Sequence, residues 1–370
     1  MKYDERELLL IWLDSFNETD YTKKRAVYEL LSGKTDLKRT IENNERFIVS
    51  KAGENLYNLL ISSANRTYLD DTLAALAKAG ERAITLESEL YPEPLKNTPN
   101  PPLVLYAKGN AELLKSKMLG VVGSRKSLPL SLSIAKDFAT ELIANGLTLV
   151  TGTAEGVDSE VLKAALSSGA VISVSAGGLN NIYPAINRDL IGKVAERGLL
   201  ISEHREYVKA QPYFFPVRNR IIAGLSEGVL VVSGKTTSGT MHTASYCIEY
   251  GKDLFAIPYS PGIASGAGPN ELIKRGAFLV DDPNDILSFY GIERAKEITS
   301  DAISNDSGFN DTERQIISVL QDGALHIEKI AELTGRQVFE ITSALMVLEI
   351  NGKIYKNGIN TYGLIRNREI

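Results

Sequence analysis

The chain has 370 residues, of which 44% are hydrophobic and 24% are charged, and its formal net charge is −5. This balance predicts a globular protein of two or three domains and argues against a uniformly basic protein that coats nucleic acid. A local basic groove stays compatible with it, because a phosphate responds mainly to nearby charges. The single cysteine, Cys247, excludes an internal disulfide and argues against a cysteine-based zinc site.

The sequence predicts neither a signal peptide nor a membrane span. The first ten residues mix acidic and basic side chains around a short apolar run, and they lack a basic start and a small-residue cleavage site. No apolar stretch reaches the roughly 18 residues that cross a bilayer. We therefore expect a cytoplasmic protein with no membrane partner.

Residues 1–65 are predicted to form a small helical domain of the SAM-like kind, because groups of leucine, isoleucine and valine recur between polar turns. Residues 66–117 are expected to connect this domain to a sheet and to extend that sheet. Within them, residues 91–102 hold five prolines, which favour a rigid, extended connector.

Residues 118–292 show the pattern of a Rossmann-like domain. Short apolar runs alternate with helix-length segments such as 130–145 and 240–250, and most runs are continuous, as in strands buried on both faces of a parallel sheet. The order predicts an α/β fold with a doubly wound, mostly parallel sheet, whose ligands lie beyond the carboxyl ends of the strands. The expected strands are 119–122, 147–150, 171–174, 199–201, 229–232, 254–257 and 278–280.

The last part of the chain is predicted to be a winged-helix domain, residues 312–370, after a polar linker, residues 293–311. Three helices are expected, and Thr312 is a plausible cap of the first. A hairpin with a turn at Asn357-Gly358 follows them. The expected helices are 312–321, 327–333 and 337–349, and the expected strands are 353–355 and 361–364.

Two glycine-containing turns follow the first two predicted strands of the Rossmann-like domain. Gly123, Ser124 and Arg125 lead into a helix, whose first N–H groups can bind a phosphate, and an arginine there can pair with phosphate or stack on a base. The same turn is equally compatible with a plain tight connection. Gly152 and Gly156 would let a ligand approach the backbone closely.

Asp158, next along the chain, is more simply expected to cap the following helix. After the fifth strand, Ser238, Gly239 and Thr240 open another helix and can hold an anion with hydroxyl and backbone N–H groups. The spacing is not that of a P-loop, so ATP hydrolysis is not indicated.

The segment from Val208 to Arg220, VKAQPYFFPVRNR, is the most informative part of the chain. It carries basic residues without an acid and interleaves them with Tyr213 and two phenylalanines, of which one is expected in the core. Basic groups that follow a backbone and rings that stack on bases are what single-strand binding requires. The predicted DNA-binding residues here are Lys209, Phe214, Phe215, Arg218, Asn219 and Arg220.

Metal and nuclease chemistry are not indicated. The three histidines have no metal-binding spacing, so we expect no metal and no cofactor. Asp158, Glu203 and Glu249 could be imagined as a nuclease cluster, but caps and surface acids explain them more simply.

The order of these motifs resembles the DNA-processing protein A family, also called DprA or Smf. The resemblance covers most of the chain, and FPVRNR after a Ser-Glu strand end is its most specific part. The matching segments are YPEPLKNTPNPPLVLYAKGN, GVVGSR, GTAEGVD, NIYP, LLISE, FPVRNRIIAGLS, SGTMHTA, AIP followed by PG, and LMVLEINGKI in the winged helix.

The resemblance implies a non-catalytic protein that binds single-stranded DNA in a basic pocket of its Rossmann-like domain. It further implies a homodimer that helps to load a RecA-type recombinase, chiefly in natural transformation. By position, Arg125, Phe215, Arg218 and Arg220 would contact DNA, whereas Lys209 is displaced from the family's usual basic residue.

Two departures mark a divergent member. Leu162 stands where the family usually has histidine, and Ser233-Gly234 stands where it usually has glutamate. An alternative function is a nucleotide-binding, phosphoribohydrolase-like enzyme of the same fold class. That enzyme needs a glutamate where this chain has Thr243, and threonine cannot supply a carboxylate.

A third interpretation makes the winged helix the main DNA reader. Arg336 precedes its third predicted helix, but Glu340 and Glu349 lie on it and would meet a phosphate backbone poorly. We therefore favour a protein-contact or autoregulatory role for this domain.

Overall fold

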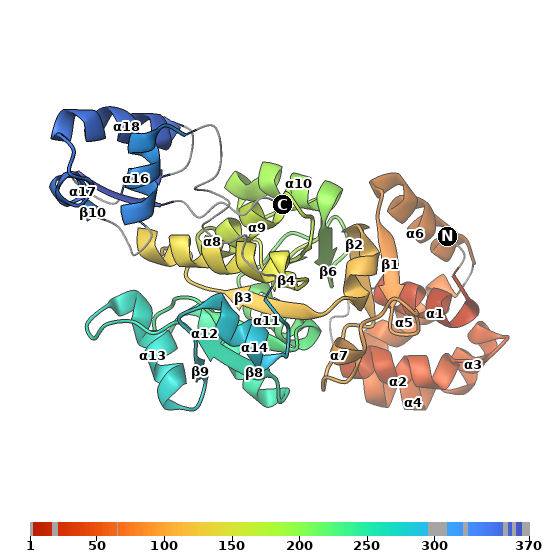
Figure 1. Cartoon of the computed structure of the whole chain (residues 1–370). Helices are drawn as coiled ribbons and strands as arrows, with labels where there is room; N and C mark the ends of the chain where they lie inside the picture. The colour runs from red at the N-terminus through yellow and green to blue at the C-terminus, as the bar shows by residue number, and fades with distance from the viewer. Residues whose placement is uncertain are drawn as a thin grey trace. The chain divides into compact units, whose positions relative to one another are not determined.

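The computed structural model describes residues 3–16, 21–64, 66–294, 309–320, 325–350, 354–356 and 360–364. They divide into two compact units, Met1–Glu293 and Arg294–Ile370 (Figure 1). Among the described residues, no helix is both long enough and apolar enough to span a bilayer.

A nine-stranded sheet forms the centre of the first unit within the described residues. Its strands are β1 (Arg82–Thr85), β2 (Val104–Gly109), β3 (Met118–Val122), β4 (Thr148–Thr151), β5 (Val171–Ser175), β6 (Leu199–Ser202), β7 (Gly228–Val231), β8 (Asp253–Ala256) and β9 (Phe278–Leu279). Their order is β1-β2-β6-β5-β4-β3-β7-β8-β9. Strands β3 to β9 pair in parallel, whereas β2 pairs antiparallel with both β1 and β6. The central parallel strands are buried along their length, which explains their continuous apolar sequences.

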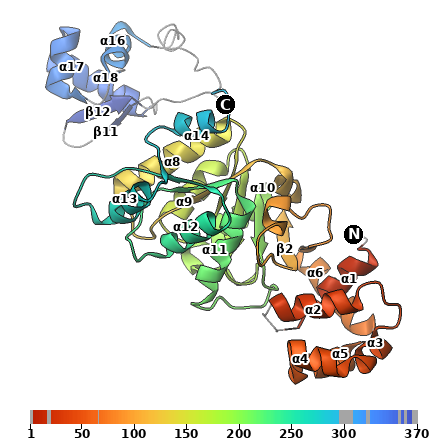
Figure 2. The same ribbon diagram turned by 90° about the horizontal axis from the view of Figure 1, so that it is seen from below.

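Helices cover both faces of the sheet (Figures 1 and 2). One face carries α8 (Pro129–Ala144), α9 (Val157–Ala165) and α10 (Arg188–Arg197), and the other carries α11 (Phe214–Leu225), α12 (Gly239–Glu249) and α13 (Ala267–Lys274). After β9, α14 (Pro283–Phe289) packs beside α8. The chain leaves the adjacent strands β3 and β7 toward opposite faces, which makes their carboxyl ends the topological switch point of the sheet. The predicted Rossmann-like, doubly wound fold is confirmed.

Six helices precede the sheet in the described part of the chain. They are α1 (Glu5–Asp14), α2 (Tyr21–Leu31), α3 (Leu37–Asn43), α4 (Glu45–Ala52), α5 (Glu54–Ser63) and α6 (Arg66–Ala79). They share one apolar core with the sheet. The fully buried Tyr106 of β2 donates its hydroxyl hydrogen to Asp14 Oδ2 at 2.8 Å, and Lys24 Nζ lies 2.9 Å from Asp14 Oδ1. These bonds fix α1 and α2 to the antiparallel edge of the sheet.

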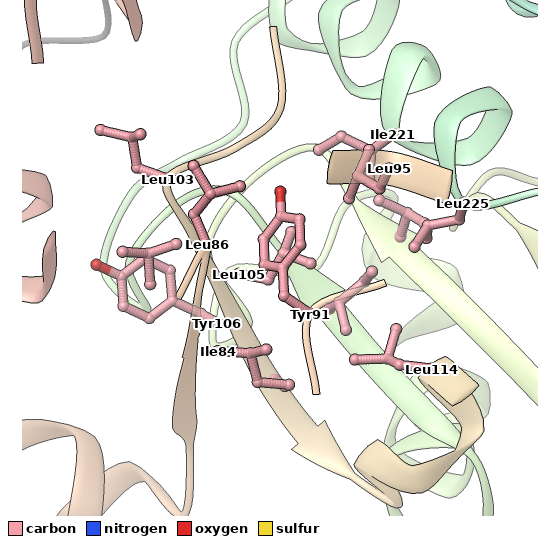
Figure 3. Packing of buried hydrophobic residues seen from close by; sticks show 14 of the residues in the cluster. Ile84, Leu86, Tyr91, Leu95, Leu103, Leu105, Tyr106, Leu114, Ile221 and Leu225 are labelled. Atoms are coloured by element: carbon pink, nitrogen blue, oxygen red, sulfur yellow. The ribbon is translucent and has the colours of Figure 1, made fainter. Parts of the chain in front are cut away.

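The proline-rich connector packs between β2 and α11 (Figure 3). It contains the short helix α7 (Glu93–Lys96), and the Tyr91 hydroxyl donates to the carbonyl oxygen of Pro102 at 2.7 Å. Leu95 lies beside Ile221 and Leu225 of α11 in the same buried cluster. The connector therefore supports the helix that begins with the basic and aromatic segment. Three short 3₁₀ helices complete this unit: η1 (Ala111–Lys115), η2 (Ala185–Asn187) and η3 (Ala264–Gly266).

The second unit contains the three helices and the hairpin of a winged helix. The helices are α16 (Asp311–Val319), α17 (Ile327–Thr334) and α18 (Val338–Ile350), and the strands are β10 (Leu325–His326), β11 (Ile354–Lys356) and β12 (Thr361–Leu364). The strands pair antiparallel in the order β10-β12-β11. The expected cap at Thr312 is wrong, because Asn310 and Glu313 form a capping box one residue before α16. The predicted turn at 357–358 and most of the predicted linker lie outside the described residues.

Candidate nucleic-acid interface

The loops that follow β3 and β7 are joined at the carboxyl edge of the sheet. The Ser124 backbone N–H donates to Ser233 Oγ at 3.2 Å, and the hydroxyls of Ser127 and Ser233 are 2.8 Å apart. Ser233 is one of the two departures from the family pattern. Its hydroxyl fixes the turn that presents Arg125.

Three side chains form what we call the aromatic–arginine cluster: Arg125 and Tyr183 from two loops, and Phe215 from the first turn of α11. The guanidinium carbon of Arg125 lies 5.0 Å from the centroid of the Phe215 ring. The rings of Tyr183 and Phe215 meet edge to face, with centroids 5.6 Å apart. Arg125 and Tyr183 are exposed and Phe215 is half-buried, so the cluster offers a cation and a ring to a ligand.

Gly156 holds the Arg125 turn in place. Its φ of +79° suits glycine, and a β-carbon there would approach the carbonyl oxygen of Arg125 to 2.6 Å. Gly123, on the same turn, packs closely against Val157 at the start of α9. Both predicted glycines are therefore explained by close packing of the chain against itself.

Arg218 lies inside the protein rather than in a loop, which corrects the expectation from sequence. It sits on the second turn of α11, is 6% exposed, and donates from Nη1 to the carbonyl oxygen of Val174 in β5. Burial lowers the pKa of its guanidinium to about 10, and attraction to Asp158 partly offsets that effect. Arg218 thus joins β5, the loop after β4 and the start of α9 beneath the cluster.

Asp158 was expected to cap α9, but this prediction is wrong. Gly156 occupies the N-cap position. The carboxylate is buried and accepts a hydrogen bond from the Ala154 backbone N–H at 3.2 Å. Burial raises its pKa, and the charge of Arg218 acts in the opposite direction. Gly152 lies against both side chains, and a β-carbon at this glycine would come within 2.6 Å of Arg218 Nη2.

Arg220 faces away from the aromatic–arginine cluster. It forms an ion pair with Glu203, which follows β6, and its Nη1 donates to the carbonyl oxygen of Asn100 at 2.6 Å. Asn219 lies between the two arginines, receives a hydrogen bond from Arg218 Nε and donates to the carbonyl oxygen of Gly239 at 3.2 Å. The RNR sequence therefore connects three strand ends.

Of the two adjacent phenylalanines, Phe214 is the core residue. Its ring is buried and stacks on His204, with centroids 4.2 Å apart. Burial lowers the pKa of that histidine. Tyr213 and Lys209, by contrast, are exposed.

The start of α12 supplies the predicted hydroxyl groups. Ser238 is the residue before α12, and its Oγ is buried with no hydrogen-bond partner among the described residues. A β-carbon at Gly234 would lie 2.7 Å from Ser238 Oγ and 3.4 Å from Thr240 Oγ1, so both hydroxyls converge on this glycine. Gly239 leaves open space at the first turn of the helix.

Two positions where the family or the alternative enzyme has a polar group, Leu162 and Thr243, are buried. Leu162, the second departure, is fully buried in the core, and Thr243 is 1% exposed on α12. No group of three or more histidine, cysteine, aspartate or glutamate side chains suited to a metal occurs in the part of the chain that the structure describes. Tyr183 was not among the predicted binding residues, although it belongs to the aromatic–arginine cluster; its position in a loop after β5 was the available signal.

The fold and this edge define a Rossmann-like protein that presents a cation and aromatic rings at its strand ends and ends in a winged helix. Residues 82–291 match the family described as DNA recombination-mediator protein A, and residues 301–356 match the DprA winged helix domain. The chain belongs to the DNA-processing protein A (DprA/Smf) family.

Relatives of this chain are known from several bacteria. It is 39% identical over 221 residues to DNA processing protein DprA of Bacillus subtilis, covering 59% of this chain and 74% of that protein. It is 34% identical over 297 residues to protein Smf of Escherichia coli, covering 78% and 79% of the two chains.

Two solved structures resemble it. DprA from Streptococcus pneumoniae superposes with a TM-score of 0.62 at 28% identity, covering 79% of this chain and 99% of that one. DNA processing protein A from Helicobacter pylori, described for its single-stranded DNA binding mode, gives a TM-score of 0.52 at 30% identity, covering 56% and 95%.

Proposed function

We propose that this protein binds single-stranded DNA at the carboxyl edge of its sheet and loads a RecA-type recombinase onto it. The observation that carries the proposal is the aromatic–arginine cluster. In it the Arg125 guanidinium lies over the Phe215 ring, and the exposed Tyr183 ring packs against Phe215. A guanidinium pairs with phosphate or stacks on a base, and a ring stacks on any base, so the cluster suits an unpaired strand of any sequence.

The predicted site residues divide into two groups by their burial. Exposed or accessible groups would touch DNA directly, whereas buried ones would position them. Direct contacts are proposed for Gly123, Ser124, Arg125, Lys209, Phe215, Ser238 and Gly239; positioning is proposed for Gly152, Gly156, Phe214, Arg218, Asn219, Arg220 and the buried Thr240.

Recombinase loading is supported by the family description, a recombination mediator. We propose that the protein acts as a homodimer in the cytoplasm, where it would meet both DNA and recombinase. The expected result is faster assembly of a RecA-type filament on single strands already coated by single-strand-binding protein. Unchanged assembly rates would contradict this part of the proposal.

We propose no catalytic activity. A phosphoribohydrolase-like mechanism needs a carboxylate after Gly239-Thr240, and the buried Thr243 offers only a hydroxyl in an apolar setting. Release of a free base from nucleoside monophosphates by the pure protein would contradict this.

The central experiment is fluorescence anisotropy with matched single- and double-stranded oligonucleotides across a salt series. We expect tighter binding to the single strand and a steep fall in affinity with salt, because each neutralised phosphate releases counterions. Equal or tighter binding to blunt duplex at physiological salt would overturn the proposed function.

A further inference from the structure

The geometry points to Tyr183 as a further base-stacking residue, so that the site holds two successive unpaired bases rather than one. The inference rests on the proposed function and deepens it. Tyr183 is 53% exposed, although its ring packs edge to face against Phe215. An exposed ring next to a cation–ring pair extends the stacking surface beyond the first base.

The backbone of Tyr183 is held where a stacking residue needs it. Thr153, in the loop after β4, donates its hydroxyl hydrogen to the carbonyl oxygen of Tyr183 at 2.9 Å. Asn187 in turn donates to the carbonyl oxygen of Thr153 at 2.9 Å and to Ser159 Oγ at 3.0 Å. Thr153 and Asn187 are buried, so the polar bonds that fix this loop are shielded from water. The ring is therefore presented by a bonded loop at little cost in conformational entropy on binding.

The surroundings of Tyr183 favour a polyanion. Between Asn180 and Asn187 the loop contains no acidic residue, and Arg188 and Asp189, which follow it, are both exposed. Arg125 lies over the Phe215 ring, which the Tyr183 ring also contacts. A strand that crosses Arg125, Phe215 and Tyr183 would thus meet the cation of Arg125 beside two rings.

The test compares Tyr183→Ala and Tyr183→Phe in the full chain, with a six-nucleotide oligothymidylate as probe. We expect Tyr183→Ala to weaken binding on the order of tenfold, the scale of one lost base stack, and Tyr183→Phe to bind like the wild type. Tyr207→Ala is the matched control, because Tyr207 is 51% exposed but lies beside Glu206 with Arg205 over its ring. It should leave affinity unchanged.

A second measurement separates stacking from support of Phe215. The same oligonucleotide is prepared with a single abasic site at each position in turn. If Tyr183 stacks on one base, removing that base should lower the affinity of the wild-type protein. The affinity of Tyr183→Ala, which already lacks this stack, should not fall further at the same position. If each abasic site lowered the affinity of the wild type and of Tyr183→Ala by the same factor, Tyr183 would only support Phe215. That result would overturn the inference.

The remaining outcomes are also decisive. Wild-type affinity in Tyr183→Ala, with Arg125→Ala weakened, would overturn the role of Tyr183 and leave the proposed function standing. A Tyr183→Phe variant as weak as Tyr183→Ala would show that the hydroxyl matters and the ring does not. No binding of the oligonucleotide by the wild type would instead reject the proposed function itself.

Discussion

Arg125 is the exposed cation of the aromatic–arginine cluster. It is exposed on a turn held by Gly156 and Ser233, and it lies over Phe215. Arg125→Ala should therefore weaken single-strand binding by about 1–3 kcal/mol without changing the free energy of unfolding. Arg125→Lys should recover part of the loss, because lysine keeps the charge but cannot pair bidentately or stack equally well.

Titration of a labelled oligonucleotide and chemical denaturation measure the two effects of Arg125→Ala separately. Arg46→Ala, an exposed arginine on α4, is the charge-matched control. Equal losses from both variants would mean that only overall charge matters, and the assigned contact would then be wrong.

Gly152 illustrates the opposite case, a residue that acts through packing. A β-carbon there meets the Asp158 carboxylate and the Arg218 guanidinium, both buried. Gly152→Ala should destabilise the fold by about 1–3 kcal/mol, as overpacking of a filled site does. Gly192→Ala on α10, where nothing lies within 4 Å of the added carbon, should be neutral or stabilising. Urea denaturation compares the two; a neutral Gly152→Ala would show that the surrounding side chains move away freely.

The difference between exposed and buried arginines was not accessible from sequence. Arg125 and Arg218 both follow predicted strands, and each has a polar residue directly after it, Lys126 and Asn219. What decides their burial is the course of α11 across the sheet, which brings Arg218 beneath β5. The sequence could not predict that Arg218 lies on a helix, nor which guanidinium enters the interior.

At the scale of elements, the predicted strands were found within one or two residues because both faces of the central sheet are covered. Helix α11 begins at Phe214, inside the basic and aromatic segment, and carries Pro216 in its first turn. Proline is tolerated in the first helical turn, where the backbone N–H has no partner in the helix. Strand β1 was missed because its four residues include an arginine and a threonine at a partly polar edge.

The junction between α6 and β1 contains a pH-sensitive carboxyl group, Glu81. The side chain is 7% exposed, and neither carboxylate oxygen has a hydrogen-bond partner among the described residues. Burial, followed by repulsion from Glu206, raises the pKa of Glu81 to about 7, against the attraction of Lys108 and Arg205. Glu206 and Arg205 belong to the loop between β6 and α11.

The sign of the effect follows from proton linkage. Between the ordinary carboxyl pKa of 4.5 and about 7, the folded chain keeps a proton on Glu81 that the unfolded chain releases. Protonated Glu81 therefore contributes its full stabilisation of the fold below pH 4.5, and this stabilisation is lost as the pH rises through about 7. Glu81→Gln should therefore flatten the fall in melting temperature across this window, whereas Glu54→Gln, exposed on α5, should not. A Glu81→Gln variant that keeps the wild-type slope would assign the slope to other groups.

At the scale of the whole molecule, the two units carry different surfaces. The first presents Arg125, Lys209 and the rings of Tyr183 and Phe215 at one sheet edge. The second presents α18, which lacks a basic residue along its length and has Phe339 71% exposed. A helix of this composition suits a protein contact better than a phosphate backbone.

Arg336, just before α18, tests this division. Its Nε donates to Gln315 Oε1 at 2.6 Å, so the guanidinium is already engaged within the second unit. Arg336→Ala should change the affinity for single-stranded DNA less than about twofold, because a single partly exposed charge that is already engaged by Gln315 contributes little. Arg125→Ala, measured with the same oligonucleotide, should reduce it by far more. If Arg336→Ala abolished binding while Arg125→Ala did not, the winged helix would be the DNA reader, and the single-stranded DNA site would have to be reassigned to the second unit.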